Sequence, residues 1–169
     1  MTEVILVNEN DEAIGTMEKM QAHREGKLHR AFSVFIVNSE DKMLLQKRAA
    51  KKYHSPNLWT NACCSHPAPD ENIFDAAKRR VKEELGMDVN VFENLFSFRY
   101  KTLLENDLIE HELDYVLWAK SDAIVKLNED EVSDFIFLSK EEIKNKLAEK
   151  PEQFTVWFKL IFPKIENLF

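Results

Sequence analysis

The sequence predicts an α/β (α+β) fold in which helices flank a mixed β-sheet. Short segments rich in β-branched and aromatic residues recur in both halves of the chain. A helical pattern with one apolar face separates the two sets of strands, and two more helical patterns close the chain. This order of strands, helix, strands and helices is typical of a mixed sheet covered by helices.

The chain of 169 residues is expected to form a single domain, 1–169, because it is long enough to bury a core of its own. Hydrophobic residues make up 44% of the sequence, with 12 Phe and 3 Trp, so we expect a packed interior. Only 3 Gly and 5 Pro occur, and no segment has the composition of a flexible linker.

The net charge of −7 argues against nucleic acid as a partner, because phosphate backbones select basic surfaces. A small phosphorylated ligand needs only a local cluster of positive charge. Cys63 and Cys64 are adjacent, so a disulfide between them is strained and the chain suits a reducing compartment. The sequence has neither a signal-peptide pattern nor an apolar run of membrane-spanning length. We therefore expect a cytoplasmic protein that does not enter a membrane, and we favour a monomer, although the sequence leaves the oligomeric state open.

The first part of the chain is expected to form a small hairpin and a helix. Residues 4–7 predict a first strand, and residues 13–15 predict the strand that returns beside it. Thr16 is expected to cap a short helix that carries His23 and ends at Gly26.

The middle of the chain predicts two strands and a helix. Residues 31–37 form the expected central strand, which a turn at 38–42 joins to a strand over 43–48. Asp70 is expected to cap a helix over residues 71–85, which Gly86 ends. The apolar face of this helix consists of Ile73, Phe74, Ala77, Val81 and Leu85.

Three strands and two helices are expected in the last part. Residues 95–100, 108–119 and 132–138 predict the strands. A capping-box pattern at 139–142 predicts the start of a helix. We expect Pro151 to start the last helix. Its apolar side chains recur at helical spacing: Phe154, Trp157, Phe158 and Ile161.

The stretch from Trp59 to Pro67 places a thiol near an imidazole. Cys64 and His66 are two residues apart, so an extended segment directs both side chains into the same cavity. One interpretation is a reactive cysteine beside a metal-binding histidine. The alternative is a buried free cysteine, a common core residue, beside a surface histidine.

Glu110 and Glu112 share one face of a predicted strand because side chains alternate along a strand. Two neighbouring carboxylates repel each other, so turning both inward requires a cation or a shared proton. The alternative is an edge strand that shows them to water. His23, His29 and His66 are scattered, but three imidazoles with two carboxylates suit Mn²⁺ or Zn²⁺ better than Mg²⁺. Otherwise these histidines are solvated or satisfied by packing.

The predicted central helix and the segments before it carry charges that suit an anion. Arg80 and Glu84 are four residues apart and can pair. Either that helix face is simply solvated, or its carboxylates hold Mg²⁺ on a diphosphate. A basic set suggests an anionic ligand, and the alternative is dispersed charge that keeps the protein soluble. The set consists of Lys19, Arg48, Lys52 and Arg80.

Residues 60–67, TNACCSHP, and the group of Tyr100 with Glu110-His111-Glu112 form two motifs in a fixed order. They resemble the cysteine and glutamate motifs of type I isopentenyl-diphosphate Δ-isomerases, a branch of the Nudix superfamily. The general Nudix box is kept only in part, at Glu71, Arg79, Glu83, Glu84, Gly86 and Met87. Ser65 replaces its glycine and Arg80 replaces its first helix glutamate, which argues against pyrophosphohydrolase activity.

The resemblance implies a Nudix-type α/β sandwich with a core at residues 28–162 and an N-terminal extension, 1–27, that contributes to the site. It implies an isomerase of isoprenoid precursor biosynthesis, which converts isopentenyl diphosphate into dimethylallyl diphosphate by adding one proton and removing another. Cys64 and Glu112 match the acid–base pair, and Tyr100 matches the residue that assists Glu112. Trp157 matches an aromatic face for the cationic intermediate.

The same resemblance implies two metal ions. The first, Mn²⁺ or Mg²⁺ with Zn²⁺ as an alternative, is held by His23, His29, His66, Glu110 and Glu112. The second, Mg²⁺, joins the diphosphate to Glu84 and to the main-chain carbonyl of Cys64. The positions that match substrate-binding residues are Lys19, Arg48, Lys52, Ser65, Arg80 and Trp157. His54 and Cys63 receive no role from the family pattern.

Two other functions remain as alternatives. A Nudix hydrolase acting on a nucleoside diphosphate derivative releases phosphate and has no need of Cys64. A non-catalytic Nudix-like binding module needs neither a metal ion nor Cys64 to bind its ligand.

Overall fold

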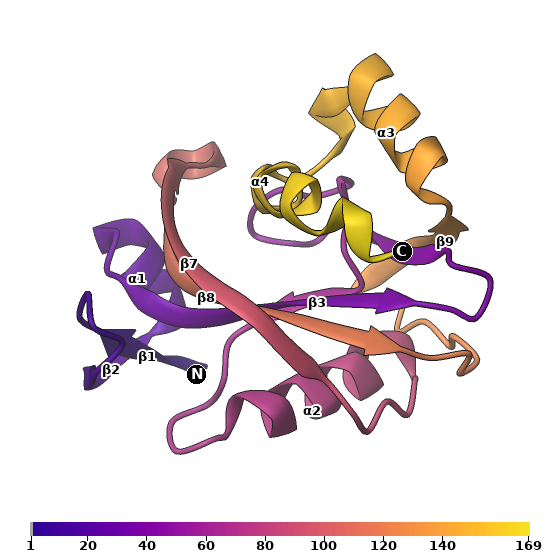
Figure 1. Cartoon of the computed structure of the whole chain (residues 1–169). Coiled ribbons are helices and arrows are strands. Elements are labelled where there is room, and N and C mark those ends of the chain that lie inside the picture. Colours follow the sequence, from indigo (N-terminus) through magenta and orange to yellow (C-terminus); the bar gives the residue numbers. More distant parts are fainter. Residues whose placement is uncertain (1) are drawn as a thin grey trace.

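A computed structural model describes residues 2–169. They form one mixed β-sheet with helices on both faces, which confirms the predicted fold class (Figure 1). The strands are β1 (Glu3–Val7), β2 (Ala13–Glu18), β3 (His29–Val37), β4 (Met43–Arg48), β5 (Trp59–Thr60), β6 (Cys63–Ser65), β7 (Glu93–Leu103), β8 (Ile109–Lys120) and β9 (Val132–Leu138). The α-helices are α1 (Lys19–Glu25), α2 (Ile73–Leu85), α3 (Lys140–Glu149) and α4 (Val156–Ile165), and short 3₁₀ turns are η1 (Glu105–Asp107), η2 (Pro151–Gln153) and η3 (Glu166–Leu168).

Strand β3 lies at the centre of the sheet and is buried along almost its whole length. It runs parallel to β8, from His29 opposite Glu112 to Val37 opposite Lys120. On its other edge it pairs antiparallel with β6 and meets β1 at one position. The predicted hairpin to β4 exists, but β3 and β4 pair only at Val37 and Met43, because β4 takes β9 as its main partner.

The two faces of the sheet bury two separate apolar cores, because successive side chains of a strand point to opposite faces. Val34 and Ile36 of β3 belong to the core beneath α2. Phe35 and Val37 belong to the core beneath α4. Figure 1 shows α2 on one side of the sheet, with α3 and α4 on the other.

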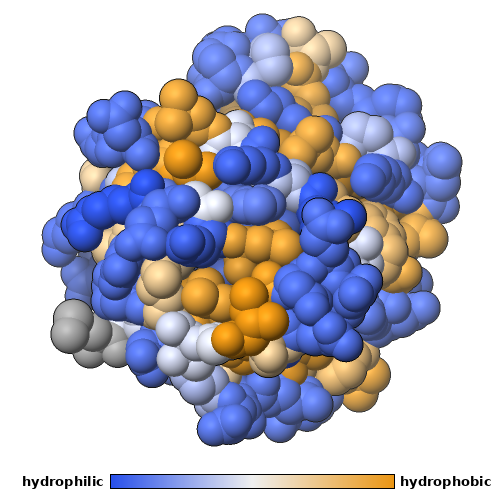
Figure 2. Space-filling model, turned by 90° about the vertical axis from the view of Figure 1, so that its left-hand side faces the viewer, coloured by the Kyte–Doolittle hydropathy of each residue, from blue (hydrophilic) through white to orange (hydrophobic). Residues whose placement is uncertain are grey.

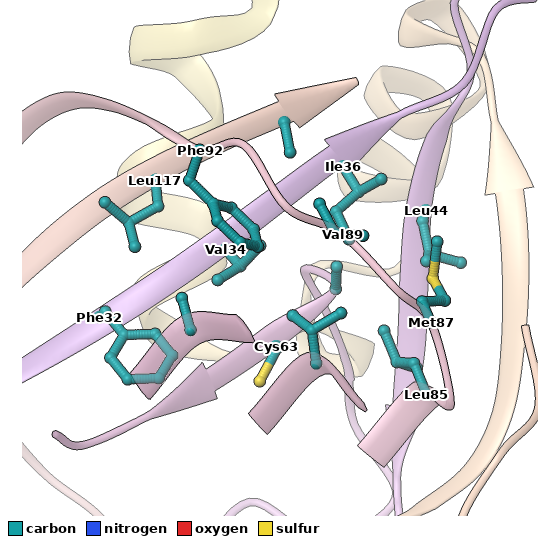
Figure 3. Close-up of a cluster of buried hydrophobic side chains, with 14 of the residues drawn as sticks. Phe32, Val34, Ile36, Leu44, Cys63, Leu85, Met87, Val89, Phe92 and Leu117 are labelled. Atoms are coloured by element: carbon teal, nitrogen blue, oxygen red, sulfur yellow. The ribbon is translucent and has the colours of Figure 1, made fainter. Parts of the chain in front are cut away.

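Helix α2 closes the first core with its C-terminal turns. Leu85 and Met87 pack with Leu44 of β4, and Phe92 and Leu117 lie at the far end of the same cluster (Figure 3). All of these side chains are nearly or fully buried.

The ends of α2 test two sequence predictions. Asp70 is not the cap: it has a left-handed backbone with φ of 65°, and the side chain of Asn72 accepts the hydrogen bond from the Phe74 amide instead. Gly86 does end the helix, with φ of 64°. A Cβ at this position would lie 2.6 Å from the Lys126 carbonyl oxygen, so the turn requires glycine.

The second core contains a row of stacked aromatic rings on the other face of the sheet. Phe154, Phe158 and Phe162 are four residues apart, and each successive pair of ring centroids lies 5.5 Å apart. The prediction that Pro151 starts the last helix is wrong. Pro151 begins only the turn η2, and α4 begins after Thr155, whose hydroxyl accepts from the Phe158 amide.

The N-terminal segment forms a hairpin, β1–β2, followed by α1. Thr16 does not cap α1, because it pairs with Ile5 inside the hairpin. The Glu18 carboxylate caps the helix by accepting from the Met20 and Gln21 amides. Gly26 ends α1 as predicted. Figure 2 shows this side of the molecule, where hydrophilic side chains surround smaller apolar patches.

The other predicted strands are present. Strand β7 is longer than the predicted strand over 95–100, because it runs to Leu103. Ser139 forms the predicted capping box with Glu142 at the start of α3. Within residues 2–169, no helix has both the length and the apolar character needed to cross a membrane.

The aromatic row predicts a large stability difference between two residues of α4. Phe158 is fully buried, whereas Leu160 on the same helix is 43% exposed. We expect Phe158→Ala to lower the free energy of unfolding by about 3–5 kcal/mol because it leaves a cavity. Leu160→Ala is expected to change it by less than about 1 kcal/mol. Urea denaturation measures both values, and equal losses would contradict this description of the core.

Candidate active site

The candidate site lies on the same face of the sheet as α4, next to the apolar core that this helix covers. Along β8, the buried residues of this face change from Trp118 and Val116 to Asp114, Glu112 and Glu110. The parallel register sets His29 of β3 opposite Glu112. In the same way β6 sets Cys64 opposite Ser33 of β3, and so brings the thiol to the same face.

Three imidazoles converge on the two carboxylates. His66 Nε2 lies 2.9 Å from Glu112 Oε1 and 3.2 Å from His29 Nε2. His29 Nε2 lies 3.6 Å from the same carboxylate oxygen. From α1, His23 brings its Nε2 to 4.0 Å from Glu110 Oε1. The structure therefore brings together all five residues that the resemblance assigns to the first metal ion.

Two of these histidines are oriented by backbone carbonyls. His23 Nδ1 lies 2.7 Å from the Lys19 oxygen, and His29 Nδ1 lies 2.8 Å from the Lys27 oxygen. A carbonyl can only accept, so each Nδ1 carries the proton and each Nε2 keeps a free lone pair. This is the arrangement that metal-binding histidines use, with the outer nitrogen fixed by a hydrogen bond.

The donor set fits a divalent cation. Ligand atoms of His23, His29, His66 and Glu112 all lie within 4.8 Å of one another. Across residues 2–169, His23 Nε2 and Glu110 Oε2 are among the few buried side-chain atoms without a hydrogen-bond partner. A buried polar atom without a partner is costly, and a bound cation removes that cost at both atoms.

The ionisation of these groups also favours a cation. Burial lowers the pKa of His66 to about 4 and lowers that of His23, so both imidazoles are uncharged at neutral pH, as metal binding requires. Burial and the nearby Glu112 charge raise the pKa of Glu110 well above its usual range. Burial opposes ionisation of Glu112 as well, but the adjacent His29 and His66 side chains lower its pKa. A cation between the carboxylates allows both to ionise.

Cys64 is held by three polar neighbours. The indole Nε1 of Trp157 donates to its sulfur at 2.9 Å, and the thiol donates to Asn61 Oδ1 at 3.1 Å. Ser33 Oγ lies 3.6 Å from the sulfur and donates to Asp114 Oδ2 at 2.7 Å. Burial raises the pKa of Cys64 to about 12, so the side chain is a thiol at neutral pH.

Tyr100 and Glu112 meet across the β7–β8 pair. Their strands place them in register, and the Tyr100 hydroxyl donates to Glu112 Oε2 at 2.9 Å. Glu112 also lines a cavity of about 60 Å³, together with Cys64 and Trp157. Proton donors and acceptors thus line one small cavity.

Three of the four predicted basic residues lie at the mouth of this cavity. A wider depression of about 460 Å³ adjoins it and is lined by Lys19, Lys52, Ser65 and Arg80. Arg48 is placed differently. Its guanidinium donates to the carbonyl oxygens of the loop residues His54 and Ser55, and it lies 5.4 Å above the Trp157 ring.

Glu84 lies outside the histidine cluster. Its carboxylate accepts from Arg80 at 2.6 Å, the predicted helix pair, and from Gln46 at 3.0 Å. Two other residues of the Nudix box, Glu71 and Arg79, form a two-point ion pair with distances of 2.7 and 2.8 Å. This pair joins the loop before α2 to the middle of the helix.

Sequence reasoning missed two residues in the site. His54 is buried beside Trp157, and its Nε2 lies 3.7 Å from Glu110 Oε2. With His23 and Glu110 it forms a second group of close ligand atoms. Asn61 is locked by donating to the Val34 and Cys63 carbonyls, which turns its oxygen to Cys64. The spacing of neither residue signals its role, although Asn61 lies inside the cysteine motif.

Solved structures with similar folds support the architecture. A crystal structure of a Deinococcus radiodurans protein matches with a TM-score of 0.72 at 23% identity, covering 88% of this chain and 90% of that one. A MutT protein from Methanosarcina mazei matches with a TM-score of 0.68 at 18% identity, covering 83% of this chain and 94% of that one. At these identities the likeness concerns the fold alone.

Comparison of sequences is more specific. A family model described as the NUDIX domain matches residues 27–158. A protein named isopentenyl-diphosphate Delta-isomerase from Pectobacterium atrosepticum is 48% identical, over 99% of this chain and 93% of its own length. A protein of the same name from Aliivibrio fischeri is also 48% identical, over 98% of this chain and 96% of its own length. The chain therefore belongs to the isopentenyl-diphosphate Delta-isomerase family, whose fold is that of the NUDIX domain.

Proposed function

We propose that this protein interconverts isopentenyl diphosphate and dimethylallyl diphosphate. The single observation that carries the proposal is the joint placement of a thiol, Cys64, and a carboxylate, Glu112, on the wall of one small buried cavity. Moving a double bond requires one proton to be added to the alkene and another to be removed from a neighbouring carbon. A site with two proton-transfer groups and little water suits this chemistry.

The isomerisation balances without any redox partner. A proton adds to the terminal CH₂ carbon, C4, the π electrons form the new C–H bond, and positive charge develops at C3. Loss of a proton from C2 returns the electron pair as the C2–C3 double bond. We assign these two transfers to Cys64 and Glu112, with the Tyr100 hydroxyl holding Glu112 Oε2 in place.

Trp157 has two parts in this proposal. Its N–H donates to the sulfur of Cys64 and so fixes the direction of the thiol. Its ring lines the cavity, and an aromatic face stabilises a nearby cation. The positive charge that develops at C3 would therefore be favoured over charge elsewhere on the substrate.

A divalent cation, Mg²⁺ or Mn²⁺ with Zn²⁺ as an alternative, would be held by the His23, His29, His66, Glu110 and Glu112 side chains. When bound, it supplies positive charge that tunes the acidity of Glu112 and of groups that contact it. The two unpartnered atoms, His23 Nε2 and Glu110 Oε2, support this assignment.

The diphosphate would lie at the wider mouth of the cavity, beside Lys19, Lys52, Arg80 and Ser65. A second ion, Mg²⁺, would accompany it near Glu84 and the main-chain carbonyl of Cys64. Arg48 would act at the inner end, where it contacts the Trp157 ring. In this assignment the NUDIX core, 28–162, supplies most of the site and the N-terminal extension, 1–27, supplies Lys19 and His23.

Hydrolysis of a nucleoside diphosphate derivative is less well supported. Arg80 stands where the Nudix box has its first helix glutamate, so a carboxylate that Nudix hydrolases use to bind metal is missing. A non-catalytic binding module does not explain the hydrogen bonds that orient the Cys64 thiol.

Substitution of Cys64 and of Glu112 tests the proposed chemistry. We expect purified protein with Mg²⁺ and isopentenyl diphosphate in D₂O to form deuterated dimethylallyl diphosphate, detected by NMR. Cys64→Ala and Glu112→Gln should each lose about 10²–10⁴-fold or more of this rate. Cys63→Ala is the matched control, because Cys63 faces the core beneath α2 and should keep the rate within severalfold. Phosphate release from nucleotides without isomerisation would instead support a hydrolase.

Removal of a single histidine tests the metal site. His23→Ala is expected to weaken Mn²⁺ binding by at least about a hundredfold, since even loss of an outer partner of a ligand weakens binding 10–100-fold. His111→Ala is the control, because His111 Nδ1 faces the Gly26 carbonyl and not the cluster. Isothermal titration of chelator-treated protein with Mn²⁺ measures both affinities. Equal affinities for the two variants would argue against this ligand set.

A further inference from the structure

Two of the cations at the cavity mouth are already paired with one carboxylate. Lys52 Nζ contacts Glu131 Oε2, and Arg80 lies 3.5 Å from the same oxygen. Glu131 lines the wider depression together with both cations. The resemblance gives Glu131 no role, and the proposed acid–base chemistry does not use it.

The positive charges are crowded enough to need a counter-ion. Burial lowers the pKa of Lys19, and the nearby charges of Lys52 and Arg80 lower it further, whereas Glu131 opposes this effect. Arg80 also keeps one donor unused, because its buried Nε has no hydrogen-bond partner among residues 2–169. Arg80 also pairs with Glu83 and Glu84 of its own helix at 2.7 and 2.6 Å, whereas Glu131 is a carboxylate that Arg80 shares with Lys52.

The backbone of Glu131 is fixed by hydrogen bonds that do not involve its side chain. Its amide donates to the Asn128 carbonyl at 2.9 Å, and its carbonyl accepts from the Ala49 amide at 3.2 Å. The next residue, Val132, is buried and begins β9. The Glu131 side chain is 28% exposed, so it can turn away without disturbing the fold.

We propose that the Glu131 carboxylate is an internal stand-in for the substrate diphosphate. It holds Lys52 and Arg80 at the cavity mouth in the free protein and gives up these ion pairs when the diphosphate arrives. Glu131 therefore sets substrate affinity and favours product release. This inference rests on the proposed function for the identity of the ligand.

The proposal predicts that removing this residue from the lining of the binding site strengthens anion binding, whereas such a removal usually weakens it. An incoming diphosphate has to replace the pairs that Glu131 makes and to tolerate its negative charge. Partly exposed ion pairs contribute little each, so the gain is modest. We expect Glu131→Gln to bind inorganic pyrophosphate about three- to tenfold more tightly than the wild type.

The matched control is Glu129→Gln, which makes the same chemical change two residues away. Glu129 is exposed and lies outside the residues that line the two cavities. Both variants change the net charge equally, so the long-range effect of charge on anion binding is the same. Glu129→Gln should bind pyrophosphate within about twofold of the wild type.

The experiment is isothermal titration of wild type and both variants with inorganic pyrophosphate, with and without Mg²⁺, at two salt concentrations. Tighter binding by Glu131→Gln alone, with a gain that shrinks at high salt, supports the proposal. Unchanged or weaker binding by Glu131→Gln overturns it, and weakening only with Mg²⁺ present makes Glu131 a metal ligand instead. Absence of pyrophosphate binding by every protein also overturns it.

Isomerisation assays on the same proteins separate this inference from the proposed function. For Glu131→Gln we expect KM for isopentenyl diphosphate to fall by a similar factor, while kcat stays the same or falls because release is slower. If the wild type isomerises and Glu131→Gln shows no gain in affinity, only the role of Glu131 fails. If Glu131→Gln binds pyrophosphate more tightly but no protein isomerises, the counter-ion role stands and the proposed reaction fails.

Discussion

The parallel pairing of β3 with β8 is the constraint on which the rest of the structure depends. It sets His29 beside Glu112 and continues to Val37 beside Lys120, so one register fixes both the core and the site. Because side chains alternate, the row that buries Phe35 beneath α4 is the row that presents Ser33 and His29 further along. A slip of one residue would move every one of these side chains to the opposite face.

The polar side chains at the end of this row can be buried because few of them are charged. Isolated charges are costly in a buried setting, and burial acts in opposite directions on bases and acids. It lowers the pKa of His66 and His23, and it raises the pKa of Glu110. Glu112, whose pKa is lowered, therefore carries most of the charge of the cluster. A bound cation would balance this charge and allow Glu110 to ionise as well.

Local patterns were sufficient to predict most elements, and long-range contacts explain what they missed. The Ser139 capping box and the Gly26 and Gly86 stops depend only on neighbours in sequence, and all three were predicted. Thr16 failed as a cap because pairing with Ile5 across the hairpin holds it in a strand. The motifs named the histidines and carboxylates, but nothing in the spacing of His54 or Glu131 connects them to residues far along the chain.

The two ends of the cavity differ in how deeply their side chains are buried. Substitutions can therefore change the chemistry and the affinity for an anion separately. At the inner end, Cys64 is fixed by Trp157 and Asn61 in a buried setting, where a small displacement of a reacting group is costly. At the mouth, the ion pairs of Glu131 are partly exposed and exchange for other anions at little cost. Substitutions at the mouth therefore act mainly on how tightly an anion is held. Under the proposed function, substitutions at the inner end act on proton transfer, because a buried group that loses its partner stays unpaired.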